Sequence, residues 1–414
     1  MSYGSGVSWR SDLAALRERD FRLLFIGRSF SAFGDALGPV AITFAVLDLG
    51  GAGDLGLVLG AQALGLTAFV LVAGVWADRV PRRRLVLIAD VLRLVAQAVT
   101  AVLVVTGAAE IWELAILGFV FGAGEAIFMP ASSALIPETV SPLRLQQANA
   151  LLGMSRAATM IAGPAAGGVL VATAGPGAAL VVHAATYAIS AAFLLPMRAR
   201  RAPGGERSGF LRELREGYRE VRSRRWLWSS IVGFALFSVM AFPAYMIAGP
   251  VIAKDELGGP GAWAVILTAG SIGSLLGSFV ALRFRPRRPM QVCWLLCLVE
   301  PPQLVLLGLA GPVPAIAFLS LLGGITFPVF ETLWTTTIQR EVPPDALGRV
   351  TSYDWFGSLV TAPLGYALAG PLVALVGASG LLYLAAVAIV VIPLAVLAVP
   401  DVRRLQSSER VVVG

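Results

Sequence analysis

The chain has 414 residues, of which 57% are hydrophobic and 14% are charged. A soluble globular domain carries about 25% charged residues, so this composition excludes an ordinary soluble protein and is typical of a membrane protein. The formal net charge of +7 would suit nucleic-acid binding, but the basic residues gather in every second connection between apolar stretches. That placement indicates contact with anionic lipid headgroups and excludes nucleic acid as the expected partner.

Apolar stretches, each about long enough to cross a bilayer, follow one another along the chain. They predict twelve helical spans, because backbone polar groups in hydrocarbon must find their partners within the same segment. In chain order the predicted spans are 21–47, 54–77, 84–106, 111–134, 146–173, 177–197, 226–252, 262–283, 289–310, 313–338, 348–374 and 379–399.

Positive charge alternates along these connections. Arginine clusters follow the second, sixth, eighth, tenth and twelfth spans, beginning at Arg79, Arg198, Arg283, Arg340 and Arg403. The intervening connections contain no basic residue near Gly50, Ala108, Gly175, Gly311 and Ala378, and the lone exception is Lys254, which is followed by two acidic residues. This alternation is the positive-inside pattern. It predicts a multi-pass protein of a bacterial cytoplasmic membrane with both termini in the cytoplasm.

The one long connection divides the chain. It opens with Pro203-Gly204-Gly205, and apolar residues then recur at helical spacing from Phe210 to Val221. This pattern predicts an amphipathic helix on the cytoplasmic surface. The expected organisation is an N-terminal six-helix bundle at 1–197, a linker at 198–225 and a C-terminal six-helix bundle at 226–414.

The two halves repeat one another. A shift of 202 residues places Val140, Pro142 and Leu145 on Val342, Pro344 and Leu347. Parallel repeats of this kind build transporters with a central site at the repeat interface.

Two motifs resemble the major facilitator superfamily. Residues 74–83, GVWADRVPRR, resemble its G-x-L-A-D-r-x-G-r-[RK] signature, although Val80-Pro81 replaces x-Gly. Residues 163–168, GPAAGG, resemble the G-P-x-x-G-G element of the family's exporters. Further segments resemble its enterobactin-exporter and macrolide-efflux branch: residues 31–35 (SAFGD), Asp90-x-x-Arg93, residues 128–131 (FMPA), 148–151 (ANAL) and 216–218 (EGY). Gly118 stands where many drug/proton antiporters carry an arginine.

The resemblance implies an all-α polytopic protein with twelve transmembrane helices in two pseudo-symmetric six-helix bundles. It implies a monomeric secondary-active exporter, a proton antiporter that moves an amphiphilic small molecule such as a drug, macrolide or siderophore by alternating access. The alternatives are a lysophospholipid transporter and a non-transporting membrane receptor. No phosphate-binding G-x-x-x-x-G-K-[ST] loop is present, so ATP is not expected to drive it. Two cysteines and one histidine cannot build a metal cluster, and neither a cofactor nor an enzyme activity is expected.

Charged residues inside spans are costly and therefore mark candidate sites. Asp35 lies near mid-depth in the first span, which lines the cavity if the resemblance holds, so it is the expected titrating carboxylate. Glu125 in span four and Glu331 in span ten are candidates for a second proton or for a cationic substrate. Arg156 in span five is the expected partner of one of them, because an unpaired buried charge is very costly. A structural pairing is the alternative for all of these.

A second group of charges is expected at the cytoplasmic side. The predicted gate consists of Asp78, Arg79, Arg82, Arg83, Asp90, Arg93 and Asp354. Within it, Asp90 and Arg93 are three residues apart and can pair on one helix face. The alternative is that the arginines only fix the topology.

Three further features concern helix geometry and packing. Gly163, Pro164, Gly167 and Gly168 are expected to let span five pack closely and bend, and by resemblance to seal the extracellular side. Pro301 and Pro302 follow Glu300 and must interrupt span nine, where a structural role is expected. His183, the only histidine, is expected to be satisfied by a hydrogen bond.

Overall fold

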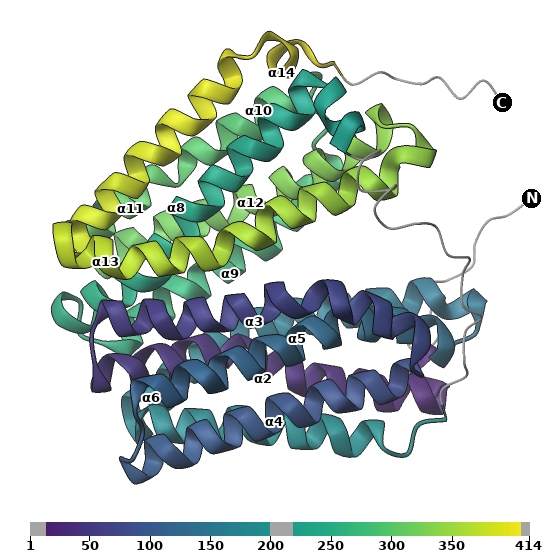
Figure 1. The fold of residues 1–414 in the computed structure, drawn as a ribbon, viewed down its shortest axis with the longest axis vertical. Helices are drawn as coiled ribbons and strands as arrows, with labels where there is room; N and C mark the ends of the chain where they lie inside the picture. Colours follow the sequence, from purple (N-terminus) through teal and green to yellow (C-terminus); the bar gives the residue numbers. More distant parts are fainter. Residues whose placement is uncertain (1–13, 199–217, 407–414) are drawn as a thin grey trace, which may run out of the picture. The chain divides into compact units, whose positions relative to one another are not determined.

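A computed structural model describes residues 14–198 and 218–406, which are built from α-helices (Figure 1). The first half has α2 Arg19–Leu49, α3 Ala52–Arg79, α4 Arg82–Thr106, α5 Ile111–Thr139 and α6 Leu145–Leu194. The second half has α8 Arg225–Glu256, α9 Pro260–Arg283, α10 Pro289–Leu296, α11 Pro301–Gly308, α12 Val313–Glu341, α13 Pro344–Ala398 and α14 Pro400–Arg404. Short 3-10 helices lie at Ala14–Arg17, Pro142–Arg144 and Cys297–Val299.

The two longest helices each break at one glycine. Gly175 in α6 has φ 83° and ψ 166°, and Gly377 in α13 has φ 77° and ψ 168°. Only glycine reaches such angles without strain, so each helix divides into two spans there. Ten helices or merged helices in the described residues are long and apolar enough to span a membrane. With these two divided, residues 14–198 and 218–406 contain the twelve predicted spans.

The repeat found in the sequence is present in the backbone. α5 and α12 are both 29 residues long, and they begin at Ile111 and Val313, 202 positions apart. The breaks at Gly175 and Gly377 are separated by the same shift. The chain is therefore an all-α polytopic membrane protein with two related halves.

The ninth span is interrupted as the double proline predicts. α10 ends at Leu296, a 3-10 turn follows, and α11 begins at Pro301. Proline lacks the amide hydrogen that would continue the helical ladder, and it is tolerated at the first position of a new helix. Glu300 lies at the junction, where it precedes α11.

The described contacts divide the chain into two compact units. One unit consists of Met1–Leu49 and Ala61–Glu206, and the other of Gly50–Gly60 and Arg207–Gly414. The core of the second unit gathers Trp226, Trp294 and Trp334 with aliphatic side chains. Of the predicted surface helix, residues 218–223 are helical, and the remainder lies outside the described residues.

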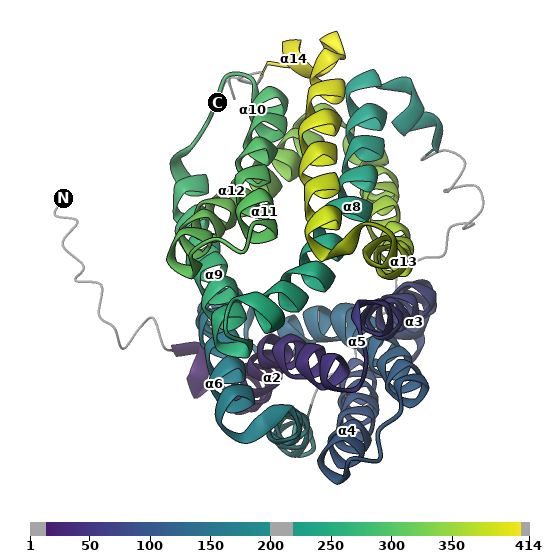
Figure 2. The same ribbon diagram turned by 90° about the vertical axis from the view of Figure 1, so that its left-hand side faces the viewer.

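In the first unit, α2 packs closely along both parts of α6 (Figure 2). A Cβ added at Gly38 would overlap the His183 ring, and one added at Gly163 would lie 2.8 Å from the backbone carbon of Ala36. Small residues at such crossings let helix backbones approach. The backbone of α6 stays helical at Pro164, and its departure from helical angles comes at Gly175.

Gly163 is therefore expected to be intolerant of a side chain. Gly163→Leu should destabilise the first unit by about 1–3 kcal/mol, because the added side chain overpacks the crossing with α2. Thermal unfolding of the purified protein in detergent measures the loss. Gly153→Leu is the matched control, since a Cβ at Gly153, on the same helix, meets open space. Equal unfolding temperatures for the two variants would contradict the expectation.

Candidate functional site

A buried arginine lies at the centre of the first unit. Arg93 on α4 is 1% exposed, and its Nη2 lies 2.5 Å from Oδ1 of Asp90. Its Nη1 lies 3.6 Å from Oδ2 of Asp35 on α2. The guanidinium carbon stands 4.0 Å from the ring centre of Phe128 and 4.6 Å from that of Tyr187. Two carboxylates and two aromatic faces therefore compensate one buried cation.

Asp90 holds Arg93 from within the same helix. Its side chain is fully buried, and its second oxygen accepts a hydrogen bond of 2.6 Å from Ser190 on α6. The ion pair predicted from the three-residue spacing is therefore confirmed. Its depth differs from the expected cytoplasmic position, because Arg93 follows the start of α4 at Arg82 by eleven residues. That distance corresponds to about 16 Å along the helix axis.

Asp35 links this pair to a chain of hydrogen bonds. The Tyr187 hydroxyl donates to Oδ1 of Asp35, and His183 Nε2 lies 3.0 Å from the same hydroxyl. Because the tyrosine donates its own proton to Asp35, it accepts one from His183, which places the imidazole proton on Nε2. His183 Nδ1 is buried without a hydrogen-bond partner, as the unprotonated nitrogen of that tautomer can be. The Asp35 side chain itself is 40% exposed.

Glu125 completes the group of charges. It lies on α5, its side chain hydrogen-bonds to Gln62, and its charge interacts with those of Asp35 and Arg93. The single guanidinium of Arg93 thus interacts with three carboxylates, those of Asp35, Asp90 and Glu125. Such a cluster can take up a proton and still keep Arg93 paired.

Two other predicted cavity residues lie elsewhere. Arg156 is exposed on α6, and no ion pair in the described part of the chain joins it to Glu125. Glu125 is therefore not its partner, because Arg93 is the cation near Glu125, and the alternative pairing with Glu331 stays a prediction. The positive charge of Arg156 instead interacts repulsively with that of Arg28 on α2. Glu331 is exposed on α12.

The predicted gate residues separate into two sets. The side chains of Asp78, Arg79 and Asp354 lie outside the residues that the structure describes in full. Arg82 and Arg83 contact the C-terminal parts of neighbouring helices. Arg82 Nη1 lies 2.8 Å from the Ala134 carbonyl and 3.1 Å from the Glu138 carboxylate. Arg83 donates hydrogen bonds to the carbonyl of Leu194, at 3.0 Å, and to that of Leu195. Cations near the C-terminus of a helix donate hydrogen bonds to its last, unpaired carbonyls and interact favourably with the negative end of its dipole. These two arginines hold the α4, α5 and α6 ends together.

Sequence reasoning missed two members of the site. Tyr187 and Ser190 contact Asp35 and Asp90, yet neither is charged, so the search for charges in spans passed over them. The available signal was the spacing of His183, Tyr187 and Ser190, which fall on one face of an otherwise apolar helix.

Comparisons with known proteins agree on the family. The model of the Major Facilitator Superfamily matches residues 24–356. The multidrug efflux pump Tap of Mycolicibacterium fortuitum is 28% identical over 362 residues, covering 82% of this chain and 85% of that protein. The pump of the same name from Mycobacterium tuberculosis (strain ATCC 25618 / H37Rv) is 27% identical over 405 residues, covering 92% and 94%.

Solved structures show the same fold. The nucleoside transporter NupG superposes with a TM-score of 0.73 at 13% identity, covering 91% of this chain and 98% of that one. A bacterial homologue of the iron transporter ferroportin gives 0.73 at 17% identity, covering 92% and 98%. The chain belongs to the major facilitator superfamily, and it is a multi-pass membrane transporter of a small molecule and not an enzyme.

Proposed function

We propose that the protein is a secondary-active exporter that exchanges protons for an amphiphilic small molecule. Relatives named as multidrug efflux pumps support export of a drug-like substrate. The observation that carries proton coupling is the position of Asp35, a partly exposed carboxylate bound to a buried arginine. An exposed group can exchange protons with water, whereas its buried partner transmits the change to other helices.

The coupling follows from the contacts of Arg93. With Asp35 ionised, the arginine pairs with Asp35 on α2 and with Asp90 on its own helix. Protonation of Asp35 removes the α2 pair, while the Asp90 pair persists. The ion pair that joins α2 and α4 therefore depends on the protonation state of Asp35. A proton bound there can bias which conformation of the protein is populated.

Flux measurements in everted vesicles test this function. An amphiphilic fluorescent dye should accumulate when a pH gradient is imposed and should be released when an ionophore collapses the gradient. Transbilayer movement of a lysophospholipid without a gradient would instead favour a lipid transporter. Binding of the dye without flux would favour a receptor.

We also propose that both termini lie in the cytoplasm and that Asp78, Arg79 and Asp354 control access from that side. The alternation of arginine clusters supports the orientation. The signature motif at residues 74–83 supports the gate.

Asp78→Asn should lower transport on the order of tenfold, a coupling of the usual allosteric size, because the ionised side chain is needed to hold the gate closed. Cytoplasmic labelling of a cysteine introduced in α3 should rise, and Cys293 and Cys297 give little background because both are buried. Asp54→Asn is the matched control, since Asp54 caps the opposite end of α3 through a 2.9 Å bond from the Gly51 amide. Unchanged flux and labelling would refute this gate.

A further inference from the structure

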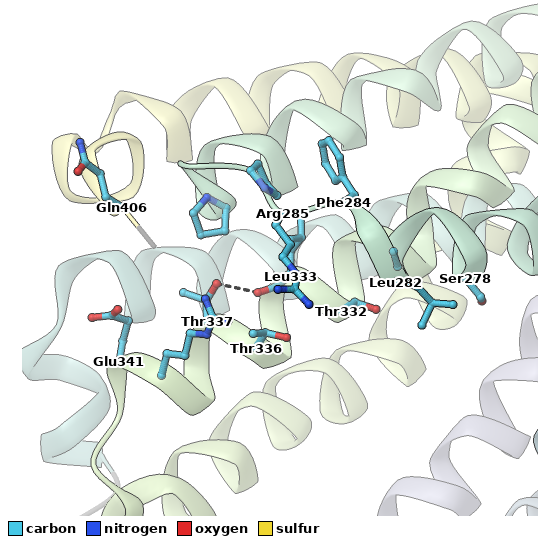
Figure 3. Close-up of a pocket in the computed structure, with 14 residues that line it drawn as sticks. Ser278, Leu282, Phe284, Arg285, Thr332, Leu333, Thr336, Thr337, Glu341 and Gln406 are labelled. Atoms are coloured by element: carbon cyan, nitrogen blue, oxygen red, sulfur yellow. Dashed lines mark hydrogen bonds between the residues drawn. The ribbon is translucent and has the colours of Figure 1, made fainter. Parts of the chain in front are cut away.

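A cavity of about 430 Å³ opens at one end of the second unit (Figure 3). The end of α9, the connection to α10, the last turns of α12 and Gln406 form its walls. Its lining residues, among those that the structure describes, include none of the charge cluster of Asp35, Asp90, Arg93 and Glu125. By the proposed topology, this end of the unit faces the cytoplasm.

The cavity is positively charged. Arg285 and Arg340 line it, and neither forms an ion pair within residues 14–198 and 218–406. One carboxylate, Glu341, also lines it, but that residue has an interaction of its own. Two guanidiniums without a carboxylate partner favour an anion with several oxygen acceptors.

Hydroxyl groups lie beside these cations. Figure 3 shows Thr332, Thr336 and Thr337 along α12 next to the Arg285 side chain. Thr337 donates to the Leu333 carbonyl at 2.7 Å, so its proton is already used. Thr332 and Thr336 make no hydrogen bond in the described part of the chain, and their hydroxyls remain available to a ligand.

An apolar surface leads into the cavity along α9. Phe279 is 62% exposed, Leu282 72% and Phe284 41%, and the last two line the cavity. In a membrane-spanning helix, such exposed apolar side chains contact acyl chains. A free inorganic anion would use the arginines alone, whereas a phospholipid uses both the arginines and the apolar surface.

We propose that this cavity binds the headgroup of an anionic phospholipid of the cytoplasmic leaflet, with its acyl chains along α9. Basic pockets between transmembrane helices on the cytoplasmic side suit such headgroups. The site rests on the proposed orientation of the chain but not on transport, so it can be tested by binding alone.

The test uses the full-length protein, purified in detergent and studied by native mass spectrometry with added phosphatidylglycerol or phosphatidylcholine. Wild type should retain phosphatidylglycerol in preference to phosphatidylcholine. The variant Arg285→Gln/Arg340→Gln should retain about tenfold less phosphatidylglycerol, because each arginine near the membrane surface contributes to holding an anionic lipid. Phosphatidylglycerol should also raise the unfolding temperature of wild type and not that of the variant.

The matched control is Arg287→Gln/Arg288→Gln. It removes the same amount of charge, from the connection that also contains Arg285, but neither residue lines the cavity. An equal loss of phosphatidylglycerol in this control, or no loss in the first variant, would overturn the proposal. Binding of inorganic phosphate as tight as that of phosphatidylglycerol would show a site for a soluble anion and would also overturn it. All four arginines are exposed, so both variants should fold, which unfolding without lipid checks.

Discussion

Arg93→Gln is expected to abolish transport and to destabilise the first unit by about 3–5 kcal/mol. The loss is large because Asp90 has no exposed surface, and glutamine would leave its charge in the helix core with Ser190 as its main partner. The two aromatic contacts of the guanidinium disappear as well. The yield of folded protein and its thermal unfolding in detergent measure this effect.

Two controls separate charge burial from general damage. Asp90→Asn/Arg93→Gln removes both charges and should recover most of the stability without restoring proton-driven transport. Arg144→Gln breaks a 3.2 Å ion pair with Glu18. In this pair the Arg144 side chain is 38% exposed and the Glu18 side chain is 27% exposed. That surface change should cost less than about 1 kcal/mol. A stable Arg93→Gln variant that still transports against a gradient would contradict the assigned role.

The fold was predictable because the bilayer permits few solutions. Its thickness sets the span length, and unpaired backbone groups cannot persist in hydrocarbon. Gly175 and Gly377 illustrate the point, since each lies between two predicted spans and carries the backbone angle that separates them. The same restriction made the interruption before Pro301 predictable.

The site was only partly predictable, because it depends on contacts between helices. The pairing of Asp90 with Arg93 follows from their spacing within one helix, and the structure confirms this ion pair. That Arg93 also reaches Asp35 depends on how α2 and α4 approach, which no local pattern gives. For the same reason the sequence offers Arg156 as a candidate partner of either Glu125 or Glu331, whereas in the structure Arg93 is the cation near Glu125. Both arginines lie in apolar spans, and only the packing distinguishes them.

Asp35→Asn is expected to uncouple transport from the proton gradient while leaving the fold intact. Asparagine keeps the shape of the side chain and can still accept the hydrogen bond from Tyr187. The lost pair with Arg93 has a 3.6 Å separation and a carboxylate that is 40% exposed, and Arg93 keeps its closer pair with Asp90, so the variant should remain folded. The variant mimics the protonated state permanently, and it therefore cannot alternate between the paired and unpaired arrangements of Arg93.

Two readouts together identify this outcome. Dye binding to purified Asp35→Asn should remain close to that of wild type, whereas dye accumulation in energised vesicles should fall to the level of passive distribution. Asp48→Asn, at the C-terminal end of α2, is the matched control and should accumulate dye normally. If Asp35→Asn still concentrates dye at the wild-type proton stoichiometry, Asp35 is not the coupling residue. Because Glu125 belongs to the same charge cluster, Glu125→Gln would then be the variant in which uphill transport should fail.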